Sequence, residues 1–264
     1  MVVYRPPMPI LRPNRFGQGA LVLASFVATL GLAACGGGAS ARYQGMTPDQ
    51  LFELASMEFE EGDHDDAIRT LDRLLLAHGD WIRIAEARLM LADVYYDRGD
   101  YLTARSEYTR FLDRYAGHPS SADAALGICR SLSQLAPTPQ RDQGYTQEAM
   151  TSCRNVVIDF AGTDQSSEAA SISNELRHTL AEKEFLNAEY YFRRRIYDAA
   201  IKYYEFVARI YPESEFAPRA LLGVYRSNMA IGYDDLAEEA RTRLLERYPD
   251  SPSAAEINAD GPSR

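Results

Sequence analysis

Cysteine, histidine and tryptophan are scarce in this chain. Its 264 residues include three cysteines, four histidines and one tryptophan. Three cysteines are too few for a fold that depends on a disulfide framework. The histidines are scattered and form none of the i, i+4 pairs that hold a metal on one helix face, so we expect them to cap helices or face solvent: His64, His78, His118 and His178. The sequence therefore predicts no metal site and no other cofactor.

A basic excess is also missing. The chain has 28 lysines and arginines against 38 aspartates and glutamates, a formal net charge of −10, and an acidic surface repels the phosphates of nucleic acid. No serine–histidine–acid set or glycine-rich phosphate loop stands out. The composition is otherwise that of a globular protein, with 46% hydrophobic residues. These features favour a binding protein over an enzyme or a nucleic-acid-binding protein.

One acidic cluster suggests a metal site at first sight. Asp63-His64-Asp65-Asp66 offers oxygen ligands of the kind that calcium prefers, but neither the glycine nor the distal glutamate of an EF-hand loop follows. Acids at the start of a helix cap its free backbone N–H groups and complement its dipole. We expect that capping role here.

No apolar stretch is long enough to form a permanent membrane span. The most apolar one, from Ala20 to Ala34, is shorter than the roughly 20 residues that a transmembrane helix needs. It follows a segment with Arg5, Arg12 and Arg15 and no acid, as in a secretory signal peptide. A buried helix is disfavoured because the run is not amphipathic and three glycines follow it at once.

The end of this run, Leu32-Ala33-Ala34-Cys35, resembles the lipobox of bacterial lipoproteins. In that pattern the cysteine receives a lipid and becomes the N-terminus after cleavage. We therefore expect residues 1–34 to be a lipoprotein signal peptide, Cys35 to carry the lipid anchor, and residues 35–46 to form a flexible tether. Gly36, rather than an acid, follows the cysteine, which implies export to the outer membrane.

From Thr47 onward the apolar residues follow a helical period, and strand-like alternation is missing. Helices are predicted in pairs, with a glycine or an arginine at the turn and an alanine five residues later. Glycine ends a helix in the left-handed conformation, and alanine lets the second helix approach the first. The five turns are 62–67, 99–104, 144–149, 195–200 and 232–237.

The period of these turns identifies the architecture. Their alanines are spaced by 37, 45, 51 and 37 residues. A tetratricopeptide (TPR) repeat has a period of 34 residues, so each spacing is that period plus an insertion. We predict an all-α fold, a TPR superhelix of five helix-turn-helix repeats over residues 47–252, followed by a disordered tail at 253–264. The larger insertions are a proline-containing loop at 136–143 and a lengthened helix at about 167–194.

The second half of the chain resembles one family closely. The resemblance rests on Leu180–Phe185 (LAEKEF), Ala188–Arg195 (AEYYFRRR), Tyr197–Ile201 (YDAAI), Arg141–Gln143 (RDQ) and the Tyr-Pro pairs at 211–212 and 248–249. With the lipobox and the five uneven repeats, these blocks make the chain similar to the BamD family, lipoproteins of the outer-membrane β-barrel assembly machinery. The resemblance covers about residues 47–252.

The resemblance implies a non-catalytic scaffold at the periplasmic face of the outer membrane. BamD-like proteins dock on the POTRA domains of the barrel protein BamA through their C-terminal repeats, here about residues 167–249. Their N-terminal repeats help receive the C-terminal segments of unfolded β-barrel proteins. The implied partners are thus a BamA-like protein, other Bam lipoproteins and unfolded clients. The alternative is another periplasmic TPR lipoprotein, which coordinates cell-wall synthesis and division or supports pilus assembly.

The repeat register also predicts a binding groove. The first helices of the first two repeats turn four apolar side chains toward the concave face, with Glu60, Asp93 and Asp97 beside them. Exposed aromatic side chains along a groove suit an extended peptide that has aromatic residues of its own. The alternative is that these side chains pack against a neighbouring element. The four residues are Phe52, Phe59, Leu89 and Tyr96.

Two further features, a pair of cysteines and a run of three arginines, each allow two interpretations. Cys129 and Cys153 lie on the two helices of the third repeat; a disulfide suits an oxidising periplasm, but the Cα atoms must come within ~7 Å, and we favour two separate buried thiols. Arg193-Arg194-Arg195 ends a helix, where positive charge complements the dipole. That structural role is favoured over contact with an acidic partner or lipid head groups.

Overall fold

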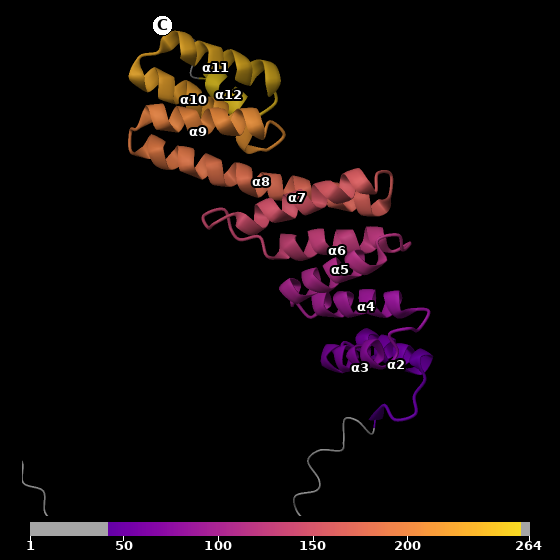
Figure 1. Cartoon of the computed structure of the whole chain (residues 1–264). Helices are drawn as coiled ribbons and strands as arrows, with labels where there is room; N and C mark the ends of the chain where they lie inside the picture. The colour runs from indigo at the N-terminus through magenta and orange to yellow at the C-terminus, as the bar shows by residue number, and fades with distance from the viewer. Residues whose placement is uncertain (1–41, 260–264) are drawn as a thin grey trace, which may run out of the picture. The chain divides into compact units, whose positions relative to one another are not determined.

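The computed structural model of the chain describes residues 42–259 (Figure 1). The predicted signal peptide, Cys35 and the first part of the tether lie outside the described residues. From Pro48 to Ala259 the described chain forms eleven helices and no strand, which confirms the all-α prediction. Within residues 42–259, no helix combines the length and the apolar composition needed to cross a membrane.

Ten of these helices form five hairpins, as the repeat spacing predicts. Each helix packs against the next one along the chain, so the hairpins stack in sequence order (Figure 1). The first helices of the hairpins are α2 (Pro48–Glu60), α4 (Ile84–Asp97), α6 (Ser121–Gln134), α8 (Asp164–Arg193) and α10 (Phe216–Ile231). The second helices are α3 (His64–Ala77), α5 (Tyr101–Tyr115), α7 (Gly144–Asp159), α9 (Tyr197–Ile210) and α11 (Asp234–Arg247).

The two insertions lie where the spacing predicts them. A loop joins α6 to α7, and α8 has 30 residues where the other hairpin helices have 13 to 16. Because of its length, α8 belongs to two hydrophobic clusters. Ala169 and Leu176 pack with α6 and α7, whereas Phe185 and Ala188 pack with α9 and α10. This helix therefore joins the two halves of the repeat domain.

The prediction of a disordered tail is wrong for residues 253–259. They belong to an eleventh helix, α12 (Pro252–Ala259), whose Ala254 and Ile257 are fully buried in the cluster formed with α10 and α11. The last hairpin of a stack has an apolar face that no further repeat covers. The helix α12 covers that face, and its burial explains why it is ordered. Residues 260–264 lie outside the description.

The hairpin turns confirm the glycine prediction at three positions, but not at Gly144, which is the first residue of α7, and they do not confirm the capping prediction. Gly62, Gly99 and Gly232 have positive φ angles, and Arg195 occupies the same position in the fourth repeat with φ 60°. The aspartates that follow the first two glycines stand at the N-cap, yet neither makes a side-chain capping hydrogen bond. The carboxylate of Asp100 pairs with Arg98 instead.

The preference for two separate thiols in the third repeat is also wrong. A disulfide joins Cys129 of α6 to Cys153 of α7, with the Cα atoms 4.8 Å apart. Both side chains are fully buried beside Ala149 and Leu126. The alanine at the helix crossing allows this approach, which is closer than the sequence alone indicated. The bridge ties together the two helices that the proline-containing loop separates.

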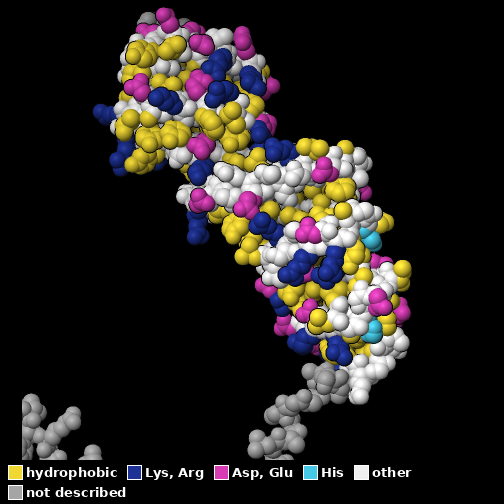
Figure 2. Space-filling view, in the orientation of Figure 1, with side chains coloured by type: hydrophobic (Ala, Val, Ile, Leu, Met, Phe, Trp, Pro, Cys, Tyr) yellow, Lys and Arg dark blue, Asp and Glu magenta, His cyan; other side chains and the backbone are white. Residues whose placement is uncertain are grey.

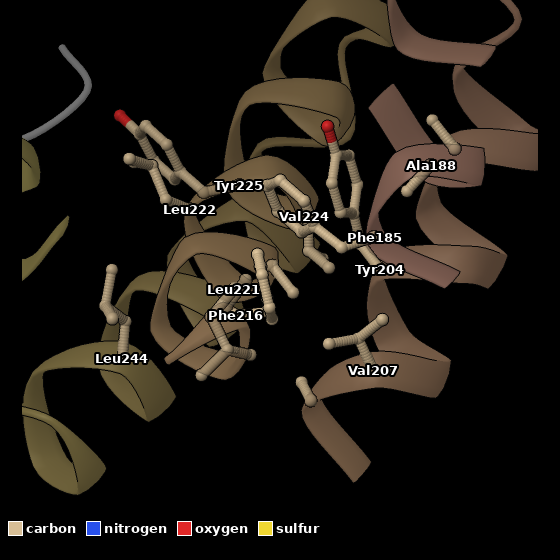
Figure 3. Packing of buried hydrophobic residues seen from close by; sticks show 14 of the residues in the cluster. Phe185, Ala188, Tyr204, Val207, Phe216, Leu221, Leu222, Val224, Tyr225 and Leu244 are labelled. Carbon is tan, nitrogen blue, oxygen red and sulfur yellow. The ribbon is translucent and has the colours of Figure 1, made fainter. Parts of the chain in front are cut away.

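Two tyrosines cross the following helix at a glycine. A Cβ atom built on Gly127 of α6 would lie 2.4 Å from Cζ of Tyr108 on α5, and one built on Gly223 of α10 would lie 2.5 Å from Cζ of Tyr204 on α9. Figure 3 shows Tyr204 between α8, α9 and α10, among the buried side chains of the C-terminal cluster. The absence of a side chain at each glycine lets a phenol ring lie against the helix backbone.

We expect Gly127→Ala to destabilise the protein by about 2 kcal/mol, although alanine favours a helix over glycine. The added methyl group overlaps the ring of Tyr108, which is 4% exposed and cannot swing into solvent. Urea unfolding followed by circular dichroism measures the effect. Gly117→Ala is the control, because nothing lies within 4 Å of that position. Equal stability of the two variants would contradict the role of the crossing.

Candidate functional site

A groove of about 570 Å³ lies on one side of the stack. Its walls come mainly from the first helices of the first four hairpins, which is the concave side in a TPR stack. Figure 2 shows hydrophobic side chains interspersed with charged ones along the stack. The groove is lined by Phe59 of α2, by Leu89, Asp93, Tyr96 and Asp97 of α4, by Tyr108 of α5, by Asp123, Leu126 and Arg130 of α6, and by Asp164, Gln165 and Glu168 of α8.

Three of the four predicted groove residues line this groove. Phe59, Leu89 and Tyr96 are half-buried: Leu89 and Tyr96 pack on one side against the cluster of α4, α5 and α6 and face the groove on the other. The predicted acids Asp93 and Asp97 stand beside them. Glu60 is exposed and outside the lining.

Phe52 is not among the lining residues. Its ring is buried against Trp81, with the centroids 5.5 Å apart, and the guanidinium of Arg83 lies 4.4 Å above it. The segment between α3 and α4 supplies both partners and covers this position. Of the four residues, only Phe52 is withdrawn from the groove by packing against a neighbouring element, which was the alternative interpretation.

The central acid of the groove is Asp93. Its Oδ1 accepts a hydrogen bond of 2.6 Å from the hydroxyl of Tyr108, whose ring crosses Gly127. Burial, together with the nearby carboxylate of Asp123, raises the pKa of Asp93 to about 6, although the Tyr108 hydroxyl and Arg130 act to lower it. Burial and the Asp93 charge also raise the pKa of Tyr108, which keeps its proton. This pair gives the groove a fixed polar floor.

The one arginine in the lining is already bound to a carboxylate. Arg130 donates from Nε and from a terminal nitrogen to the two oxygens of Glu168, each at 2.5 Å, and this contact lowers the pKa of Glu168. Asp123 accepts a 2.6 Å hydrogen bond from Gln165. Five carboxylates thus line the groove with a single guanidinium. The groove carries a net negative charge and favours a ligand with positive charge.

The lining offers recognition and no evident covalent chemistry. It has apolar surface, carboxylates and a tyrosine hydroxyl, the groups that hold an extended segment by contact and charge. In the described part of the chain, no group of three or more histidine, cysteine, aspartate or glutamate side chains is placed to hold a metal ion. His64, instead, forms a 2.8 Å contact with Asp97 at the groove rim.

Seven of the twelve lining residues, Tyr108 of α5 and six from α6 and α8, were not predicted from the sequence. Asp123, Leu126 and Arg130 come from α6, and Asp164, Gln165 and Glu168 from the start of α8. The prediction stopped at the second repeat because the loop at 136–143 and the long α8 disturb the repeat register beyond it. The crossing of Tyr108 over Gly127 fixes which face of α6 lies toward α5. With that reference point, the register of the first helices could be continued to α6, where it identifies Asp123, Leu126 and Arg130.

A comparison with protein-family models matches residues 44–244 to YfiO, described as an outer membrane lipoprotein. The matched segment extends through all five hairpins as far as Leu244 of α11. It includes every residue that lines the groove.

Curated relatives carry a consistent name. The outer membrane protein assembly factor BamD of Caulobacter vibrioides is 23% identical over 240 residues, covering 88% of this chain and 77% of the relative. The putative outer membrane protein assembly factor BamD of Aquifex aeolicus is 26% identical over 250 residues, covering 89% and 81%. Among solved structures, the TPR2AB-domain:pHSP90 complex of yeast Sti1 matches 76% of this chain and 78% of its own, at 15% identity and a TM-score of 0.43.

The raised pKa of Asp93 predicts a specific pH dependence of stability. Because the folded state holds this proton more tightly than the unfolded chain, the contribution of Asp93 to stability grows as pH falls through 6 toward 4, by about 3 kcal/mol at most. Asp93→Asn removes it. The difference in unfolding free energy between wild type and variant should therefore change between pH 7 and pH 4.

Urea unfolding at a series of pH values measures this difference. Asp113→Asn, at an exposed carboxylate of α5 outside the groove lining, is the control and should leave the pH profile of the wild type in place. Parallel profiles for wild type and Asp93→Asn would show that Asp93 titrates as a solvated carboxylate.

Proposed function

The chain belongs to the YfiO family of outer membrane lipoproteins, and on that basis we propose that it is an assembly factor for β-barrel proteins of the outer membrane. It acts by binding, as a member of a Bam-type complex, and without covalent chemistry. The observation that carries the proposal is the family match across all five hairpins. The relatives named BamD support it, since they align with more than three quarters of this chain and of their own length.

The proposal includes a lipid anchor at the periplasmic face. The lipobox at Leu32–Cys35 supports lipidation of Cys35, and the family description, outer membrane lipoprotein, agrees with it. Residues 35–46 then tether the helical repeats to the membrane. With the signal peptide removed, the acidic repeat domain lies in the periplasm.

The division of labour within the domain follows the two halves that α8 joins. The C-terminal half, about residues 167–249, docks on the POTRA domains of a BamA-like barrel protein, and other Bam lipoproteins join the complex. The N-terminal groove receives the C-terminal segments of unfolded barrel proteins. Its half-buried Phe59, Leu89 and Tyr96 support this role because they offer apolar contacts to aromatic side chains of a client.

Affinity purification from detergent-solubilised outer membranes tests the complex. We expect the tagged full-length protein to recover a POTRA-bearing barrel protein, and Cys35→Ser to move the protein from the membrane to the soluble fraction. The readout is mass spectrometry of the eluate with immunoblots of both fractions. Recovery of peptidoglycan enzymes without a POTRA-bearing protein would overturn the assembly role.

Peptide binding tests the groove separately. We expect Phe59→Ser with Tyr96→Ser to weaken binding of a peptide copied from the last strand of an outer-membrane barrel protein about tenfold or more, since two apolar contacts are lost. Fluorescence anisotropy measures the dissociation constant. Leu102→Ser is the matched control, because Leu102 is 52% exposed and outside the groove. Unchanged binding by the double variant would show that the groove does not bind the C-terminal segments of unfolded barrel proteins.

A further inference from the structure

The groove has a counterpart in the C-terminal half of the same chain. Seven residues of the groove, and the glycine at the crossing, each have an equivalent 96 residues later in the sequence. The equivalents lie on α8, α9 and α10 instead of α4, α5 and α6. The equivalent pairs are Leu89 and Phe185, Asp93 and Glu189, Tyr96 and Phe192, Asp97 and Arg193, Tyr108 and Tyr204, Asp123 and Arg219, Gly127 and Gly223, and Arg130 and Arg226.

The two sets share their geometry as well as their spacing. Tyr108 donates to Asp93, and Tyr204 donates to Glu189, across the same separation of 15 residues. Both phenol rings cross a glycine of the next helix. In both sets, the arginine that follows the glycine pairs with a glutamate two helices later, Glu168 of α8 in the first set and Glu256 of α12 in the second. The short α12 thus stands where a further repeat would.

The charges at the rim are inverted between the two sets. Asp97 is replaced by Arg193, and Asp123 by Arg219; both arginines are exposed. Among the described residues neither of them pairs with a carboxylate. Arg219 lies 4.4 Å above the ring of Phe185 and 5.4 Å from that of Phe216. The positive charge of Arg193 acts on the hydroxyl of Tyr204. The second set is therefore a basic rim on an aromatic floor.

The turn beside this rim adds a third line of support. Arg195 adopts φ 60°, where three other repeats use glycine, and a residue with a side chain is strained in that conformation. Arg194 lies 4.6 Å from the ring of Tyr190, which is 45% exposed. This turn therefore places a positive charge where a glycine would be free of strain. Packing does not explain it, because Arg194 and Arg195 are both exposed.

We propose that Arg193, Arg219 and their aromatic neighbours form a second docking site on the C-terminal half, which binds an acidic polypeptide segment with apolar side chains. The acid supplies the charge that the unpaired guanidinium groups lack, and the apolar residues lie against the half-buried Phe192 and the exposed Tyr190. The first groove, with its carboxylates, excludes such a segment. The proposal does not require the assembly role, since it rests on charge and geometry within this chain.

A polypeptide fits the site better than a lipid surface. The two arginines stand on different helices, Arg193 at the end of α8 and Arg219 in the first turn of α10. A narrow segment contacts both arginines and the accessible rings of Tyr190 and Phe192 at the end of α8, whereas a flat bilayer reaches only the outermost charges. The experiment must therefore distinguish binding of an acidic peptide from binding of anionic lipid vesicles.

Two synthetic peptides test the proposal on the full-length soluble protein that carries Cys35→Ser. Both have the same alternating aromatic residues; one is flanked by glutamates and the other by lysines. We expect the glutamate peptide to bind the wild-type repeats and to lose at least tenfold in affinity with Arg193→Asp and Arg219→Asp combined. The lysine peptide should be unaffected by that change.

The reciprocal variant, Asp97→Arg with Asp123→Arg, is the matched control. It should leave the affinity of the glutamate peptide at the second site in place and weaken the lysine peptide at the first. Circular dichroism and thermal unfolding check that both variants fold, and Arg193→Gln with Arg219→Gln supplies a milder change if the aspartate variant does not. Equal affinity of the glutamate peptide for wild type and a folded double variant would overturn the proposal.

Vesicles of phosphatidylglycerol test whether the arginines bind a lipid surface instead of a peptide. Flotation of the wild-type protein with these vesicles, lost in the Arg193 and Arg219 variant, together with no binding of the glutamate peptide, would assign the arginines to lipid and overturn the polypeptide site. Failure to recover a POTRA-bearing protein, by contrast, bears on the assembly role alone.

Discussion

The crossing of a tyrosine over a glycine is the contact on which the helix stack depends. A phenol ring from a second helix lies against the backbone of the next first helix, at Tyr108 over Gly127 and at Tyr204 over Gly223. The crossing lets the helices approach closely at two of the four junctions between hairpins, and it brings each hydroxyl to an acid on the preceding first helix. One packing contact thus positions the polar centre of each half. The core and the binding surface are therefore built by the same residues.

The sequence predicted the parts of the fold that depend on local pattern. Glycine at Gly62, Gly99 and Gly232, followed by alanine, identified the hairpin turns and through them the five repeats. Prediction from the sequence failed where the structure depends on contacts between residues that are far apart in the chain. The helix α12 has no strong pattern of its own and is ordered by the face of α10 and α11 that it covers. Likewise, the meeting of Cys129 and Cys153 depends on how closely two helices cross, which no spacing rule specifies.

The candidate site shows the same division. Phe59, Leu89 and Tyr96 follow from the register of two regular repeats, and they line the groove. Phe52 has the same register, but Trp81 and Arg83, from an irregular segment, cover it. Arg130 and Glu168 were missed because a loop and a lengthened helix separate them in sequence, while an ion pair joins them in space. The electrostatic character of the groove depends on these later residues, since they bring one base and several acids to its far wall.

The length of α8 fixes the distance between the groove of the N-terminal half and the equivalent residues of the C-terminal half. Glu168, near its start, belongs to the wall of the first groove, and Glu189, near its end, belongs to the centre of the second set. At 1.5 Å per residue, these positions are about 32 Å apart along one continuous helix. An extended chain rises about 3.3 Å per residue, so a segment of roughly ten residues reaches from one to the other. That is the length of a single strand that crosses a membrane in a β-barrel.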